Sequence, residues 1–179
     1  MRCVKYWAAA LHRRSLPFAI AAAILLLDRV TKAIIRARVG PWESFPVIPN
    51  FFNIVHAENP GVAFGLLADS TGVWRSVFLI GISVAVLAFI SILLWRKNTS
   101  QDWTLRLGLA CVLGGAAGNL IDRVVNGTVT DFLEVYSGSH YFPAFNVADS
   151  AITIGAGLLL LDMLVSKKSE PRGIKSNAS

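Results

Sequence analysis

Charged side chains are scarce in this chain, and their scarcity excludes an ordinary soluble domain. Only 16% of the 179 residues are charged, whereas 54% are hydrophobic and the mean hydropathy is +0.56. Soluble domains usually carry about 25% charged residues. The net charge of +6 is high enough for a nucleic-acid-binding protein, but the basic residues flank apolar runs at the chain ends and in one loop. We therefore expect a single membrane domain over residues 1–179, with no nucleic acid among its partners.

Cysteine and histidine are also sparse, which argues against disulfides and metal sites. Cys3 and Cys111 are far apart and show no metal or redox spacing, so we expect two free thiols. The three histidines form no metal-ligand pattern, and the sequence has neither a Gly-x-Ser-x-Gly elbow nor a phosphate-binding glycine loop. We expect chemistry that uses no metal and no cofactor.

Long apolar runs, in contrast, are present. Four segments approach the length of about 20 residues that a helix needs to cross the hydrocarbon core. They lie at about 16–35, 75–95, 103–123 and 144–165. The first follows two arginines, as in a secretory signal, but Asp28, Arg29 and Lys32 stand where a cleavage site would be, so we expect a retained span. The glycine-rich run 114–118 in the third segment predicts a face where helices pack closely.

Basic residues are distributed unequally between the two sides that these spans would define. Ten of them fall in the N-terminal segment, in the loop after the second span and in the polar tail 166–179, against four in the other connections. Because basic residues favour the cytoplasmic side, we expect both termini in the cytoplasm and the connections 36–74 and 124–143 outside. The longer outer connection predicts a small sheet, followed by a turn at Asn59-Pro60-Gly61 and a short interfacial segment at 62–67.

Two similar polar patterns stand on consecutive apolar segments, namely Asn119-Leu-Ile-Asp122 and Asn146-Val-Ala-Asp149. The predicted topology brings both patterns to the outer membrane face, and Asp131 lies in the connection between them. Carboxylates at membrane depth are costly, so each one is a candidate for function.

Two carboxylates brought together in a poorly hydrated site can share one proton. Such a pair can activate water with one acid and protonate a leaving amine with the other. Spacing does not decide which two of Asp28, Asp122, Asp131 and Asp149 form the pair, although it favours the two Asn-x-x-Asp acids. Asp28 and Lys32 are four residues apart on one helical face, so a structural ion pair is expected there.

The residues alone leave other functions for these acids open. A small proton-coupled transporter would also use intramembrane carboxylates, but the chain has four spans and no internal repeat. A structural membrane adaptor would explain the spans but not several acids on one side. Glu58, Asp69 and Glu134 are expected to be loop acids with no assignable role.

Five sequence blocks resemble the motif set of bacterial lipoprotein signal peptidase, also called signal peptidase II. The blocks are Asp28-Arg-Val-Thr-Lys32, Asn59-Pro-Gly-Val-Ala-Phe64, Gly114-Gly-Ala-Ala-Gly-Asn119-Leu-Ile-Asp122-Arg123, Gly127-Thr-Val-Thr-Asp131-Phe132 and Phe145-Asn146-Val-Ala-Asp149-Ser-Ala-Ile152. They occur in the family's order and cover the chain from about residue 28 to 152. Arg29 stands where glutamine is more common in the family.

The resemblance implies an α-helical integral membrane protein with four transmembrane helices, a small extracytoplasmic β-cradle and a short interfacial helix. The implied location is the bacterial cytoplasmic (inner) membrane, among membrane lipids. The implied activity is that of an aspartyl intramembrane endopeptidase that removes signal peptides from diacylglyceryl-modified prolipoproteins, cutting before the lipid-modified cysteine. The cyclic peptide globomycin is the implied inhibitor.

The resemblance also assigns the acids. Asp131 and Asp149 become the catalytic pair, so the second catalytic role moves away from Asp122. The residues that match substrate-binding or supporting positions are Asn59, Gly61, Asn119, Asp122, Arg123, Asn146, Asp28 and Lys32. We expect Asp122 to be a buried support, fixed by a salt bridge with its neighbour Arg123.

Overall fold

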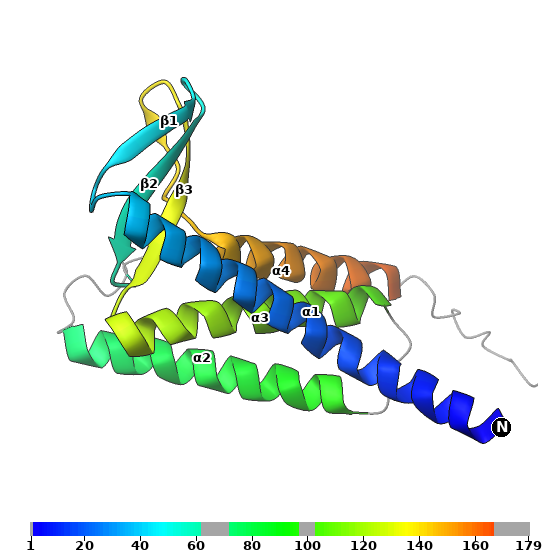
Figure 1. The fold of residues 1–179 in the computed structure, drawn as a ribbon. Coiled ribbons are helices and arrows are strands. Elements are labelled where there is room, and N and C mark those ends of the chain that lie inside the picture. The colour runs from blue at the N-terminus through cyan, green and yellow to red at the C-terminus, as the bar shows by residue number, and fades with distance from the viewer. Residues whose placement is uncertain (1, 62–71, 97–102, 167–179) are drawn as a thin grey trace, which may run out of the picture.

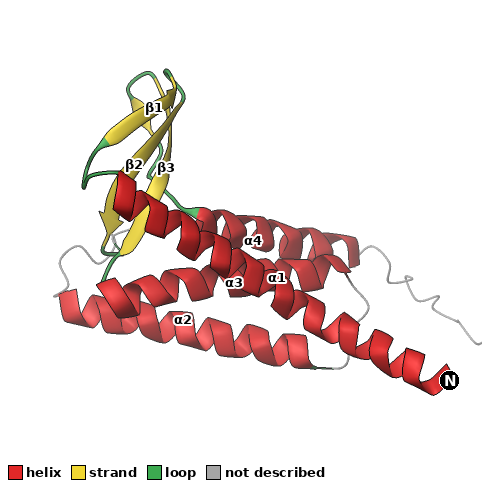
Figure 2. Ribbon diagram, viewed as in Figure 1, coloured by secondary structure: helices red, strands yellow, loops and turns green. Residues whose placement is uncertain are grey.

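A sheet stands at one end of four helices that run lengthwise beside one another (Figure 1). The computed structural model describes residues 2–61, 72–96 and 103–166, and for residues 2–14 it describes the backbone only. In chain order the elements are α1 (Arg2–Arg38), β1 (Ser44–Ile48), β2 (Phe52–Asn59), α2 (Gly72–Trp95), α3 (Trp103–Asn126), β3 (Val129–Ser137), β4 (His140–Tyr141) and α4 (Val147–Ser166). Figure 2 shows the same division into a helical body and a small β-structure. The interfacial segment expected at 62–67 lies outside the described residues, as does the tail from 167 onward.

Three helical segments within the described residues are long and apolar enough to cross a membrane. They are Val73–Trp95, Trp103–Asn126 and Val147–Val165. α1 carries more charge, but Asp28 and Lys32 have no exposed surface, whereas Leu26 and Ile34 are 65% and 54% exposed. Because α1 turns these two charges inward and apolar side chains outward, it can serve as the fourth transmembrane helix. The expected fold class is confirmed.

The helix α3 lies against all three other helices. A Cβ atom on Gly114 would lie 2.6 Å from the carbonyl oxygen of Ala21 on α1, and one on Gly115 would collide with the carbonyl oxygen of Ala148 on α4. The packing face predicted from the glycine-rich run is therefore confirmed. Two neighbours approach α3 this closely because these positions have no side chain.

The four strands form one antiparallel sheet in the order β1-β2-β3-β4. In the central pair, Glu58 of β2 lies opposite Thr130 of β3, and Ala57 lies opposite Asp131. Side chains alternate between the two faces of a strand pair. Asp131 therefore shares one face with Asn59, while Glu58 and Thr130 share the other.

Two expectations about these segments need correction. Glu58 and Glu134 were expected in loops, but they lie on β2 and β3. The helix α4 begins at Val147 and not near residue 144, because Phe145 forms an isolated bridge with Leu133 of β3 before the helix starts. Asp69 lies outside the described residues.

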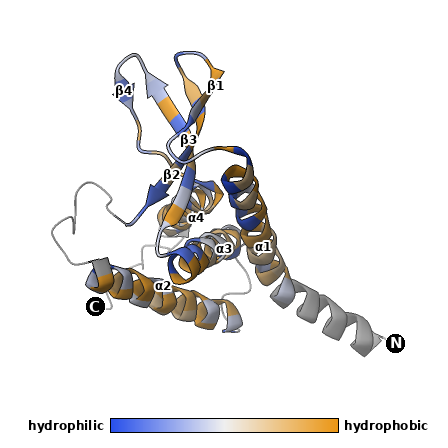
Figure 3. Ribbon diagram, turned by 60° about the vertical axis from the view of Figure 1, so that its left-hand side comes forward, coloured by the Kyte–Doolittle hydropathy of each residue, from blue (hydrophilic) through white to orange (hydrophobic). Residues whose placement is uncertain are grey.

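Apolar contacts join the sheet to the helices. Ile35 and Val39 at the end of α1 are buried against Phe132 of β3. Hydrophilic residues gather where α1, α3 and the sheet meet, whereas the helices elsewhere are mainly hydrophobic (Figure 3). The junction between sheet and helices is therefore where polar chemistry is concentrated.

Candidate active site

Asp131 lies on β3, with only 3% of its surface exposed. Its carboxylate accepts hydrogen bonds from the side-chain amides of Asn59 (3.0 Å) and Asn146 (2.7 Å). Burial raises the pKa of Asp131 to about 6, and the charge of Asp149 adds to this rise, while the two amides and the charge of Lys32 oppose it. A carboxyl that changes protonation near neutral pH is suited to proton transfer.

Asp149 is partly buried in the first turn of α4. One oxygen accepts a hydrogen bond from the side-chain amide of Asn119 at 2.7 Å, and the other accepts one from the backbone N–H of Asn146 at 3.2 Å. In return, the backbone N–H of Asp149 donates to Oδ1 of Asn146 at 2.9 Å. This exchange has the geometry of a capping box, so the Asn146-x-x-Asp149 spacing follows from the way the helix begins.

Asn146 and Asn119 connect the two acids. The side-chain amide of Asn146 donates to Asp131. Its side-chain oxygen accepts from the backbone N–H of Asp149, and its own backbone N–H donates to the Asp149 carboxylate. Oδ1 of Asn119 lies 3.3 Å from the amide nitrogen of Asn146 and accepts a hydrogen bond of 3.0 Å from Lys32. The fold thus brings the two carboxylates close enough for the charge of one to act on the other.

Asp122, which spacing had favoured, has no exposed surface and lies among three cations of α1. Its carboxylate contacts Arg29, Lys32 at 2.9 Å and Arg36 at 2.8 Å. In the described part of the chain all its ion-pair partners come from α1, so the expected salt bridge with Arg123 is wrong. Adjacent residues of a helix point in different directions, which separates the two side chains. The expected role as a buried support stays consistent with this position, since Asp122 joins α3 to α1.

The ion pair between Asp28 and Lys32 is confirmed, at 2.8 Å and fully buried. The other oxygen of Asp28 accepts a hydrogen bond of 3.0 Å from the backbone N–H of Ala148. A carboxylate at a helix N-terminus satisfies a free N–H group and stabilises the helix dipole. Asp28 therefore holds the start of α4, the helix that carries Asp149.

Arg123 lies near enough to the acids for its charge to act on them. It interacts electrostatically with Asp149, Asp131 and Asp122. One guanidinium nitrogen lies 3.4 Å from the backbone oxygen of Asn119, and the Nε atom is buried without a hydrogen-bond partner among the described residues. This guanidinium therefore keeps one buried N–H group that is not paired within the described structure.

Gly61 follows Asn59 in a turn that requires glycine. Its φ of +92° is in the left-handed region, and a Cβ atom would collide with Leu79 of α2. Its backbone N–H donates to Oδ1 of Asn59 at 2.8 Å, which leaves the amide nitrogen of Asn59 directed at Asp131. Gly61 thereby fixes which way the Asn59 amide points.

Sequence reasoning missed the importance of Arg36. Its Nη2 donates to Asp122 at 2.8 Å, and its Nε donates to the Thr130 hydroxyl at 2.8 Å. Arg29, Lys32 and Arg36 are three and four residues apart, so they lie on one face of α1. That spacing was the available signal, but Arg36 was counted only as a basic residue on the outer side.

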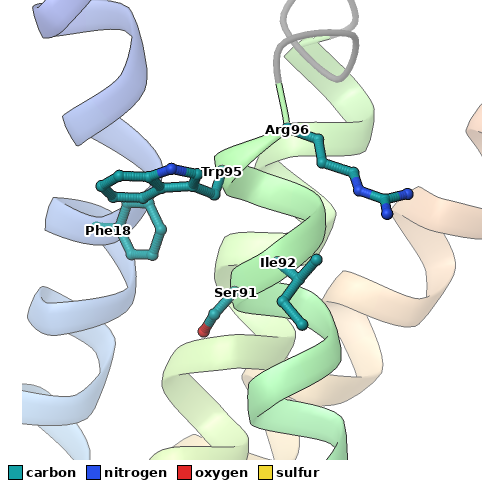
Figure 4. A pocket seen from close by; sticks show the side chains of 5 residues that line it. All are labelled: Phe18, Ser91, Ile92, Trp95 and Arg96. Atoms are coloured by element: carbon teal, nitrogen blue, oxygen red, sulfur yellow. The ribbon is translucent and has the colours of Figure 1, made fainter.

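An apolar pocket of about 430 Å³ lies away from the sheet, between α1 and α2. Figure 4 shows Phe18 of α1 beside Trp95 of α2, with Ser91, Ile92 and Arg96 completing the lining. None of these residues belongs to the acid cluster. Among the described residues, no group of three or more His, Cys, Asp or Glu side chains is arranged to hold a metal ion.

Known proteins are similar to this chain in sequence. A family model described as signal peptidase (SPase) II matches residues 20–165. A lipoprotein signal peptidase of Solibacter usitatus is 46% identical over 154 residues, which cover 84% of this chain and 92% of the relative. Another, from Pseudomonas putida, is 47% identical over 148 residues, which cover 82% of this chain and 85% of the relative. The chain belongs to the signal peptidase II family.

Solved structures agree with this signal peptidase II assignment. Two of them, both described as bacterial membrane enzymes determined by the in meso method, share the fold. One has a TM-score of 0.76 and 30% identity, and the match covers 90% of this chain and 95% of that chain. The other has a TM-score of 0.73 and 33% identity, with coverages of 84% and 93%. The family resemblance carried by the five sequence blocks is confirmed, and the chain is a membrane peptidase.

Proposed function

We propose that this chain is an aspartyl endopeptidase that cleaves diacylglyceryl-modified prolipoproteins just before their lipid-modified cysteine. The observation that carries the proposal is the position of Asn146 between two acids, donating to Asp131 and exchanging hydrogen bonds with Asp149. The names of the relatives support the substrate, since both are lipoprotein signal peptidases. Family membership supports the processing of prolipoprotein signal peptides in general, and the acid pair supplies the chemistry.

In the proposed reaction, a water molecule lies between Asp131 and Asp149. Burial and the repulsion between the two carboxylates keep one proton on the pair. The ionised acid accepts a proton from the water as its oxygen attacks the scissile carbonyl carbon. The protonated acid then supplies a proton to the leaving nitrogen, and the peptide C–N bond breaks.

Neighbouring residues orient the peptide and the acids in this proposal. Arg123 binds a backbone oxygen of the substrate, because its guanidinium lies by the acids with an unused donor. Asn59 and Asn146 hold Asp131, while Asn119 holds Asp149. The remaining supports are Gly61, Asp122, Asp28 and Lys32, through the contacts given above.

The position of the acids in the fold supports the proposed membrane setting. Both acids lie where the sheet meets the helices, while the ten basic residues of the termini and the 96–97 loop mark the other side. We place the chain as one domain in the bacterial inner membrane, with both termini in the cytoplasm and the acids near the outer face. Membrane lipids and the substrate's lipid chains then contact the exposed apolar helix surfaces, and globomycin occupies the substrate's position.

The test is incubation of the purified protein with a diacylglyceryl-modified prolipoprotein, with and without globomycin, followed by mass spectrometry of the products. We expect a single cut before the modified cysteine, blocked by globomycin.

Asp131→Asn and Asp149→Asn should each lower the rate by about a hundredfold or more, because acid–base catalysis is lost. Asp162→Asn, at the far end of α4, is the matched control and should cleave normally. Full activity in Asp131→Asn would remove that residue from the pair.

A further inference from the structure

The face of the β2–β3 pair that turns away from the acids carries a second polar cluster. Glu58 of β2 accepts hydrogen bonds from the hydroxyls of Thr130 on β3 (2.8 Å) and of Thr128, just before β3 (2.5 Å). Nε2 of His56 lies 3.1 Å from the same carboxylate. Three side chains therefore converge on Glu58, which has no part in the proposed chemistry.

This cluster reaches the end of α1 by two routes. The Thr130 hydroxyl, which donates to Glu58, accepts a hydrogen bond of 2.8 Å from Nε of Arg36. Nδ1 of His56 lies 2.8 Å from the backbone oxygen of Val39, just beyond the helix. A protonated histidine ring donates to both of its acceptors, whereas a neutral ring donates to one. Glu58 thus links both strands to α1.

The residues of this cluster are chain neighbours of residues that form the site. Glu58 precedes Asn59, and Thr130 precedes Asp131, with side chains on opposite faces of the strand pair. A shift of either strand against α1 would therefore move Asp131, because backbone neighbours move together. Thr130 has no exposed surface, so this contact is screened from solvent.

We propose that Glu58 is a positioning residue. It joins the β2–β3 pair to α1 on the face opposite Asp131 and thereby fixes the position of the Asp131 carboxylate relative to Asp149. The inference rests on the proposed function, because it concerns the same pair of acids. In this proposal Glu58, which lies outside the membrane spans, holds the strand that carries Asp131.

The charge state of Glu58 suits this role. Partial burial opposes its ionisation, but hydrogen bonds from Thr128, Thr130 and His56, together with the charge of Arg36, outweigh burial and lower the pKa of Glu58. An ionised carboxylate accepts hydrogen bonds at both oxygens, which a glutamine amide cannot do. Both the length and the charge of the Glu58 side chain therefore contribute to holding the strand pair.

The fold does not depend on Glu58 alone. The strand pair keeps its backbone ladder, and the buried contact of Ile35 and Val39 with Phe132 still joins α1 to β3. Replacing Glu58 should therefore loosen the strand position while leaving the chain folded. The effect should fall on kcat, because substrate binding uses other contacts.

The experiment compares cleavage kinetics of Glu58→Ala, Glu58→Gln and a control, Glu134→Ala. Glu134 accepts a hydrogen bond of 2.9 Å from Asn53 across the same two strands, but farther from the acids. We expect Glu58→Ala to lower kcat by about tenfold or more with KM changed less than about twofold, since small misplacements are costly in catalysis. Glu58→Gln keeps one oxygen acceptor and should lose only about threefold. Glu134→Ala should match the wild type.

A further variant tests whether the loss runs through the proposed contact. Thr128→Val should lower kcat in the wild-type background but cause no additional loss in Glu58→Ala. Additive losses would overturn the inference, as would a Glu58→Ala enzyme that equals Glu134→Ala. A loss of kcat that disappears when the assay is cooled below the variant's unfolding range would also overturn it. Failure of the wild type to cleave would instead contradict the proposed function itself.

Discussion

At the scale of single residues, amides rather than charges place both acids. Asn119 accepts a hydrogen bond from Lys32 through its oxygen and donates one to Asp149 through its nitrogen. Asn146 likewise donates to Asp131 and accepts from the backbone of Asp149. An amide can donate and accept at once without adding a charge that would change the protonation of its neighbours. Two asparagines can therefore hold a carboxylate pair that must share a proton.

Asn146 combines a helix cap with a hydrogen bond to Asp131, and one substitution should separate these roles. Serine is also a good N-cap residue, but it has no amide to reach Asp131. We expect Asn146→Ser to lower the free energy of unfolding by no more than about 3 kcal/mol, because the cap survives although buried hydrogen bonds are lost. Its kcat should fall by about tenfold or more, because Asp131 loses a donor. Cleavage kinetics and thermal unfolding in detergent measure the two effects, and wild-type kcat in Asn146→Ser would contradict this division.

The raised pKa of Asp131 gives the stability a defined pH dependence. Its value of about 6 in the folded protein compares with an ordinary 3.8. Between about pH 4 and 6 the folded chain keeps a proton that the unfolded chain releases, so the free energy of unfolding falls as pH rises. The fall through Asp131 is at most about 3 kcal/mol and ends above pH 6.

Asp131→Asn cannot titrate at this position. We therefore expect the variant to gain stability relative to the wild type as pH rises from 4 to 6, measured as the difference in apparent unfolding temperature in detergent. A difference between Asp131→Asn and wild type that stays constant with pH would show that burial does not hold the proton on Asp131.

At the scale of elements, sequence patterns predicted the helices and their packing but missed contacts between residues far apart in the chain. Apolar length predicted the helices, and glycine content predicted the packing face of α3. Spacing favoured Asp122 over Asp131, because it compares only residues one helical turn apart. The partners of Asp131 are Asn59 and Asn146, which only the folded sheet brings to it. Five sequence blocks, read as a family resemblance, supplied that long-range information.

The close approach of α3 and α4 is a property of these elements that one methyl group can test. Alanine at Gly115 would collide with the backbone oxygen of Ala148, and backbone cannot move aside as a side chain can. We expect Gly115→Ala to displace the start of α4 and lower kcat by about tenfold or more, with a loss of about 1–3 kcal/mol in stability. Gly157→Ala on α4 is the control, since a Cβ atom there meets nothing within 4 Å. Equal kinetics in the two variants would mean that the helices separate without moving Asp149.

At the scale of the whole molecule, charge is gathered inside and apolar surface faces outward. Asp28, Lys32 and Asp122 are fully buried between helices, while Leu26 and Phe89 are 65% and 62% exposed. A soluble protein would have the reverse arrangement. Buried charges in lipid are tolerated when they pair with one another, as they do here. The same cluster that makes the bundle compatible with a membrane also holds the start of α4 at the acids.

The proposed orientation assigns the two ends of the bundle to opposite sides of the membrane. The helix α2 runs away from the sheet and ends at Trp95, far from it (Figure 1), and Arg96 follows directly in the chain. His140 lies on β4 and is exposed. The basic residues near Arg96 should keep that end in the cytoplasm, since translocating them is unfavourable. The test places one cysteine at either position, in a chain whose Cys3 and Cys111 are replaced by alanine, and applies a membrane-impermeant maleimide to spheroplasts. We expect labelling of His140→Cys in intact spheroplasts and of Arg96→Cys only after lysis, with both reacting in detergent as the control. Labelling of Arg96→Cys before lysis would reverse the proposed topology and place the acids on the cytoplasmic side.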